Sequence, residues 1–175
     1  MKLRGIIDED ICNYQKISMF LIFPYCSFKC DKEAGTKICQ NSILVDTPII
    51  DISAIELCER YIKNPITNAI VCGGLEPFDS RFELFVFIDA LRRIYNCNDD
   101  IVIYTGYTKE ELENTTEEGL STLYKNLFGF PNIIVKYGRY IPNETPRYDE
   151  ILGVELSSSN QYARRLTNEN PYHIE

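Results

Sequence analysis

Short apolar runs alternate along this chain with segments that carry the spacing and start signals of helices. The runs cover residues 18–23, 68–72, 100–104 and 133–136, and a further one at 151–156 suits a last strand. Apolar runs of this length are typical of strands that are buried on both faces. Because parallel neighbours need crossovers, and helices in those crossovers cover the sheet, the alternation predicts an α/β fold with a mainly parallel sheet.

Three of the intervening segments begin with a capping-box pattern. Ser53, Ser80 and Thr108 each stand three residues before a glutamate, the spacing at which a hydroxyl and a carboxylate satisfy the first amides of a helix. We therefore expect a helix to open at each of these positions. The first helix should end at Lys63, before an Asn-Pro pair, and a further helical stretch should run to about Leu127.

The composition indicates one acidic domain. With 175 residues and 45% hydrophobic content, the chain can bury one core, and residues 1–175 are expected to form a single domain. A net charge of -8 repels phosphate backbones and anionic lipids, so neither nucleic acid nor a membrane is an expected partner. An odd number of cysteines, with no signal peptide or long apolar run, indicates a cytoplasmic protein with reduced thiols.

Three cysteines gather in the segment that follows the first expected strand. Three residues separate Cys26 from Cys30 in the motif Cys-x3-Cys, and Cys39 follows after eight more residues. Three thiolates on one such loop can hold three irons of a 4Fe-4S cube and leave the fourth iron open for a substrate. Zinc is the alternative, with a fourth ligand from another cysteine: Cys12, Cys72 or Cys97. The only histidine, His173, sits in the C-terminal tail, which also leaves little scope for a histidine relay in catalysis.

Turns rich in glycine and hydroxyl groups follow the next two expected strands. Gly73-Gly74-Leu75-Glu76-Pro77 follows the second strand, and Thr105-Gly106-Tyr107 follows the third. In parallel α/β folds, the loops that leave the carboxyl ends of the strands gather at one edge and build the site. We therefore expect the cysteine loop and both turns to face one another. A glycine pair at a strand end permits close approach of a ligand to the backbone.

Taken together, these motifs resemble the radical S-adenosylmethionine superfamily. Several segments are more narrowly similar to the short activating proteins of anaerobic ribonucleoside-triphosphate reductase, over about Asp8 to Gln161: Cys39-Gln40-Asn41, Tyr104-Thr105-Gly106-Tyr107-Thr108, Val135-Lys136-Tyr137-Gly138-Arg139-Tyr140 and Ser158-Ser159-Asn160-Gln161. The resemblance implies an incomplete (β/α)6 barrel, a 4Fe-4S cluster and reductive cleavage of S-adenosylmethionine to a 5'-deoxyadenosyl radical. It also implies two partners: a glycyl-radical enzyme such as anaerobic ribonucleotide reductase, which loses a glycine hydrogen to that radical, and a flavodoxin or ferredoxin-type reductant.

The resemblance assigns roles to individual residues. The implied cluster ligands are Cys26, Cys30 and Cys39. The implied cofactor-binding residues are Gly73, Gly74 and Glu76 at the methionine amino group, and Thr105, Gly106, Lys136 and Asn160 near the nucleoside. No catalytic residue is implied. The plainer interpretation is that Glu76 is a solvated loop acid, Thr105 a strand-end hydroxyl, Lys136 a surface base and Asn160 part of a turn.

Two features of the chain differ from the family pattern. Eight residues separate Cys30 from Cys39, where the family has two, and Leu75 stands between the glycine pair and Glu76. The longer loop is polar and costs little closure entropy, so we expect it on the surface beside the cluster. Two other functions stay open: a small radical enzyme that acts on a small molecule, as the 7-carboxy-7-deazaguanine synthases do, and a non-enzymatic iron-sulfur or zinc-binding module.

Overall fold

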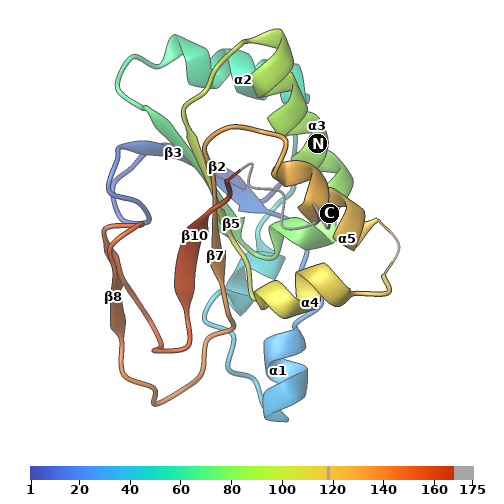
Figure 1. Ribbon diagram of the computed structural model, residues 1–175, viewed down its shortest axis with the longest axis vertical. Coiled ribbons are helices and arrows are strands. Elements are labelled where there is room, and N and C mark those ends of the chain that lie inside the picture. Colours follow the sequence, from blue (N-terminus) through green and yellow to red (C-terminus); the bar gives the residue numbers. More distant parts are fainter. Residues whose placement is uncertain (118, 168–175) are drawn as a thin grey trace, which may run out of the picture.

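A six-stranded, mostly parallel sheet forms the centre of the protein (Figure 1). The computed structural model describes residues 1–117 and 119–167, and His173 lies outside these ranges. The strand order is β10-β7-β6-β5-β3-β2, and β3, β5, β6 and β7 run parallel while the two edge strands are antiparallel to their neighbours. The bounds are β2 (Gly5–Asp10), β3 (Ser18–Phe23), β5 (Ala69–Gly74), β6 (Asp100–Tyr104), β7 (Ile133–Tyr137) and β10 (Tyr162–Arg165). The predicted α/β class and mainly parallel sheet are confirmed.

The two edge strands were not predicted, and the last expected strand was placed wrongly. Residues 151–156 do not join the central sheet; only Val154–Leu156 is a strand, β9, which pairs with β8 (Arg147–Asp149) in a separate hairpin. An edge strand has one neighbour and can carry charged residues, so β2 and β10 lack the apolar run that marks a central strand. A short antiparallel pair, β1 (Lys2–Leu3) with β4 (Ile50–Asp51), completes the strands of the described residues.

The main helices pack on one face of the sheet. Successive parallel strands are adjacent in the order β3-β5-β6-β7, so each crossover moves in the same direction and leaves its helix on the same side. The helices are α2 (Ala54–Lys63), α3 (Arg81–Asp89), α4 (Lys109–Asn114) and α5 (Leu120–Leu127). Shorter helical elements are α1 (Lys29–Ala34), the 3-10 helices η1 (Ser42–Asp46) and η2 (Pro77–Ser80), and the short π-helix η3 (Ala90–Ile94). Cys58 and Cys72 are fully buried in the core between these helices and the sheet.

Two of the three predicted capping boxes are confirmed. Ser53 and Glu56 exchange side-chain and backbone hydrogen bonds at the start of α2, and Thr108 and Glu111 do the same at α4. A helix, α3, does begin after Ser80 as expected, but the predicted capping box there was wrong: η2 runs directly into α3 and the Ser80 hydroxyl makes no capping hydrogen bond. That hydroxyl is buried without a hydrogen-bond partner.

The opposite face of the sheet is covered by loops and the β8-β9 hairpin. Val71, Val102 and Ile134 project from the central strands into a second apolar cluster, which also contains Tyr14 and Leu152. The loop that carries Tyr14 is fixed at the amino end of β6, where the buried carboxylate of Asp100 accepts hydrogen bonds from Tyr14, Lys16 and Arg165. Both faces of the sheet are therefore covered.

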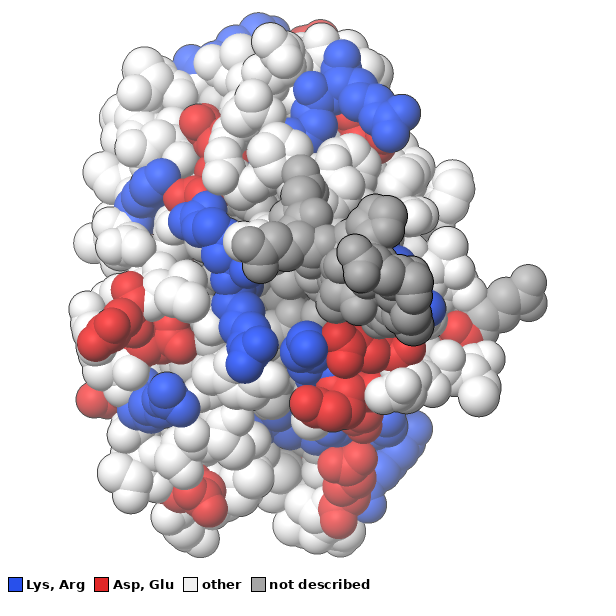
Figure 2. All heavy atoms as spheres, in the orientation of Figure 1, with Lys and Arg blue, Asp and Glu red and all other residues white. Residues whose placement is uncertain are grey.

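No helix of the described residues is long and apolar enough to cross a membrane. Figure 2 shows basic and acidic side chains next to one another across the face on view.

Candidate cluster and cofactor site

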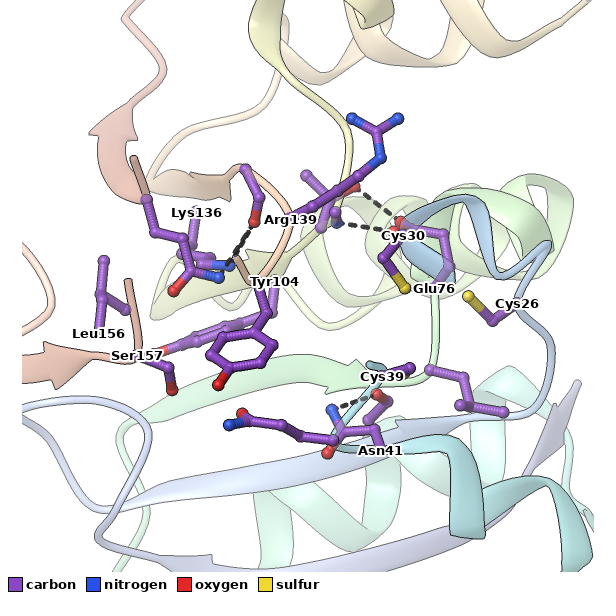
Figure 3. Close-up of a pocket in the computed structure, with 18 of the residues that line it drawn as sticks. Cys26, Cys30, Cys39, Asn41, Glu76, Tyr104, Lys136, Arg139, Leu156 and Ser157 are labelled. Atoms are coloured by element: carbon purple, nitrogen blue, oxygen red, sulfur yellow. Dashed lines mark hydrogen bonds between the residues drawn. The ribbon is translucent and has the colours of Figure 1, made fainter. Parts of the chain in front are cut away.

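A cavity of about 470 Å³ lies at the carboxyl edge of the parallel strands (Figure 3). The loops that follow β3, β5, β6 and β7 all contribute to its lining, as the strand order predicts. The predicted site residues that line it are Cys26, Cys30, Cys39, Gly74, Glu76, Thr105, Gly106 and Lys136. Gly73 and Asn160 do not line it: Gly73 packs under Phe20, and Asn160 hydrogen-bonds to the backbone of Arg139.

The three cysteines are free thiols at one end of the cavity. Figure 3 shows the sulfur atoms of Cys26 and Cys30 turned toward each other. The Phe28 amide donates a hydrogen bond to the sulfur of Cys26, with a nitrogen–sulfur distance of 3.3 Å. Burial raises the pKa of Cys26 to about 12 and that of Cys30 to about 11, and the neighbouring Cys39 thiol contributes to the second shift. Without a metal, these groups are therefore neutral thiols.

The three cysteines supply the thiolate donors that a 4Fe-4S cluster takes, and zinc is the alternative metal for such donors. Within residues 1–117 and 119–167, no three histidine, cysteine or acidic side chains converge on a point that would hold a single metal ion. Zinc needs such convergence, whereas a cube takes each thiolate on a different iron. Of the three candidate fourth zinc ligands, Cys72 is in the core and Cys97 lies outside the cavity, whereas Cys12 lines the cavity.

The glycine pair holds β3 and β5 close together. Gly74 has a φ of +80°, and a Cβ atom at this position would lie 2.6 Å from Cγ2 of Ile22 on β3. A Cβ atom at Gly73 would lie 3.0 Å from the ring of Phe20. The carbonyl oxygen of Gly74 accepts a hydrogen bond of 2.7 Å from the Asn41 side chain, so the segment after the third cysteine is tied to this turn.

Glu76 is a buried carboxylate that spans the turns after β5 and β6. Only 7% of the residue is exposed, so it is not a solvated loop acid. It accepts hydrogen bonds from the Thr105 hydroxyl and the Gly106 amide, both at 2.8 Å, and from the Phe78 amide at 3.1 Å. Burial raises the pKa of Glu76 to about 7, although these donors act in the opposite direction. Leu75 has therefore not removed the carboxylate from the cavity.

Lys136 brings a buried cation to the other end of the cavity. The residue is 6% exposed, so it is not a surface base, and its ammonium donates a hydrogen bond of 2.8 Å to the carbonyl oxygen of Gly138. The nitrogen also lies 5.8 Å from the ring centre of Tyr104. Burial lowers the pKa of Lys136 to about 8, and the Glu76 carboxylate partly opposes this shift.

Sequence reasoning missed the residues that hold the rim of the cavity together. Arg139 forms an ion pair with Glu111 at 2.7 Å and a second one with Glu33 at 3.3 Å. Lys29 pairs with the same Glu111 at 2.8 Å. Arg139 stands just after the fourth strand, but its acidic partners Glu33 and Glu111 lie on α1 and α4, and no sequence pattern links the three residues.

Comparison with known proteins gives one match. A family model described as a 4Fe-4S single cluster domain matches residues 16–149. The matched segment contains Cys26, Cys30 and Cys39, the glycine turn and Lys136, and it ends before Asn160. No curated protein matches the chain, and no solved structure does.

Proposed function

The chain belongs to the 4Fe-4S single cluster domain family, and from that premise we propose that it is a radical S-adenosylmethionine enzyme in an incomplete (β/α)6 barrel. The observation that carries the proposal is the meeting of three free thiols with a buried carboxylate at the carboxyl edge of the sheet. Cys26, Cys30 and Cys39 would hold the cluster. The chemistry supplied by that cluster, when bound and reduced, is cleavage of S-adenosylmethionine to a 5'-deoxyadenosyl radical.

The chain's own residues would bind and orient the cofactor. Glu76 carries a carboxylate for the methionine amino group, and its three hydrogen-bond donors keep it in place. Thr105, Gly106 and Lys136 would border the nucleoside, since they line the same cavity. The buried surroundings of Glu76 and Lys136 exclude water, which strengthens their electrostatic interactions with a ligand.

The cavity volume supports a protein as the substrate. Pockets for one small ligand measure roughly 300–1,000 Å³, and the cavity of about 470 Å³ must take both a cluster and a nucleoside cofactor. Little room is left for a second small molecule. We therefore propose that the partner enzyme completes the site, as a glycyl-radical enzyme such as anaerobic ribonucleotide reductase would when its glycine gives up a hydrogen atom. A flavodoxin or ferredoxin-type protein would supply the electron.

The proposal is tested by anaerobic reconstitution followed by an assay for 5'-deoxyadenosine with dithionite and S-adenosylmethionine. We expect about four irons per chain and formation of 5'-deoxyadenosine, with both lost in Cys39→Ala. Cys97→Ala is the matched control, because Cys97 lies outside the cavity. A full cluster without any 5'-deoxyadenosine would leave only an electron-transfer or structural role, and stoichiometric zinc would contradict the cluster itself.

A further inference from the structure

The long segment between Cys30 and Cys39 has a defined structure. It begins within α1, turns at Gly35, where φ is +66°, and returns to Cys39 at the cavity. Helix α1 contains no buried residue, so no apolar contact of its own holds it in place. Polar contacts must therefore define its path.

One carboxylate oxygen joins the two ends of this segment. Oδ1 of Asp31 accepts hydrogen bonds from the backbone amides of Ile38 and Cys39, at 2.9 and 2.8 Å. The thiol of Cys30 lies 3.7 Å from the same oxygen. Asp31 is adjacent to Cys30 in the sequence, so this single side chain sets the position of the third cysteine relative to the second.

Ion pairs fix the helix that carries Asp31. Lys29 and Glu33, on either side of it in the sequence, pair with Glu111 and Arg139, and these two residues pair with each other. The side chain of Arg139 is only 13% exposed, so solvent screens its ion pairs less than those of a surface arginine. In Figure 1, α1 lies beyond the end of the sheet, below α4. Asp31 is thus held by a helix that is itself anchored to the strand ends.

We propose that Asp31 is a positioning residue that holds Cys39 where it can serve as the third cluster ligand. A loop with eight residues between two ligands would otherwise leave its third thiol in many positions. A side-chain oxygen that accepts two amide hydrogen bonds removes much of that freedom, because it ties both amides to one point. This inference rests on the proposed set of cluster ligands. The two hydrogen bonds to Asp31 would thus fix the long loop from within.

The test compares Asp31→Ala and Asp31→Asn with the native protein after anaerobic reconstitution. The first readout is the rate at which iron passes to a chelator. Loss of a group that orients a metal ligand typically costs about 10–100-fold in metal affinity, so we expect Asp31→Ala to lose iron about tenfold faster. Asn keeps an oxygen for both amides and should restore a rate near the native one. Glu33→Ala is the matched control: it removes a carboxylate of the same helix that does not contact Cys39, and the Lys29–Glu111 ion pair still anchors the helix in that variant.

Two readouts separate positioning from a general effect on the loop. Hydrogen exchange of the Ile38 and Cys39 amides in the apoprotein should be faster in Asp31→Ala and close to native in Asp31→Asn. The paramagnetic resonance spectrum of the reduced cluster should change in Asp31→Ala but not in Glu33→Ala. Iron loss from Asp31→Ala at the rate of Glu33→Ala, or equal loss from the Ala and Asn variants, would overturn the proposal.

The ligand assignment is tested separately with Cys39→Ala. Loss of the cluster in this variant, together with a native rate in Asp31→Ala, would overturn the positioning role alone. A full and stable cluster in Cys39→Ala would overturn the proposed ligand set, and the inference with it.

Discussion

Replacement of Gly74 by alanine should destabilise the protein more than any ordinary surface change. The backbone of Gly74 has a φ of +80°, a region that costs other residues about 1–2 kcal/mol. A new Cβ atom would also lie 2.6 Å from Cγ2 and 3.2 Å from Cα of Ile22, and such overpacking typically costs about 1–3 kcal/mol. We therefore expect Gly74→Ala to lower the free energy of unfolding by about 2–5 kcal/mol.

Urea unfolding of the apoprotein, followed by circular dichroism, would measure this loss. Gly35→Ala is the matched control, because Gly35 has a φ of +66° and no atom lies within 4 Å of the Cβ that would be added. That variant carries the backbone cost alone, about 1–2 kcal/mol or less on an exposed loop. The difference between the two variants therefore isolates the contact between β3 and β5.

A double variant checks the same contact from the other strand. Ile22→Ala removes Cγ2, the nearest atom, so combining it with Gly74→Ala should recover about 1–2 kcal/mol relative to the sum of the single changes. Equal stability of the Gly74→Ala and Gly35→Ala proteins would refute the argument, as would simple additivity in the double variant.

Four further predictions concern other polar side chains. Asp100→Asn should cost about 1–2 kcal/mol at pH 7, after allowance for screening of the partly exposed Lys16 and Arg165. Burial raises the pKa of Asp100, but hydrogen bonds from Arg165 and Lys16 outweigh it and hold the pKa at about 2. The stabilisation is thus present above about pH 4 and should fall to about half at pH 3 in urea titrations. Ser80→Ala should leave the unfolding free energy unchanged or higher, since it removes an unpaired buried hydroxyl, whereas loss of the Ser53 cap should cost about 1 kcal/mol. Glu76→Ala should keep the iron content but weaken the change that S-adenosylmethionine produces in the resonance spectrum; an unchanged response would remove Glu76 from the cofactor site.

The central strands and the position of the cavity were predictable because the apolar runs that mark the strands are local features of the sequence. The run at 18–23 became β3 and the run at 100–104 became β6 with unchanged bounds. Strands buried on both faces need continuous apolar residues, so an apolar run in the sequence predicts such a strand directly. Once these strands are parallel, their carboxyl ends must share an edge, which brings the cysteine loop and the turn at Thr105 together without knowledge of any side-chain contact.

The environment of the site residues was not predictable in the same way. Glu76 and Lys136 are charged side chains in short loop or strand-end motifs, and such residues are mostly exposed. Their burial depends on the loops of other strands and on the β8-β9 hairpin, which covers the face of the sheet that has no helices. The hairpin itself has strands of three residues, too short for a periodic pattern to reveal.

Most of the polar groups around the cavity are held by the protein itself before any ligand enters. Glu76 is fixed by Thr105 and Gly106, and Asn41 is fixed by the carbonyl of Gly74. Each of these hydrogen bonds joins two different loops, so the cavity keeps its shape only if the strand ends keep their spacing. The close packing that Gly74 allows therefore has a functional consequence: an ångström of separation between β3 and β5 would move the cysteine loop away from Glu76. A variant that widens this spacing should lose cofactor binding before it loses the fold, because the orientation of groups at a site tolerates less error than core packing does.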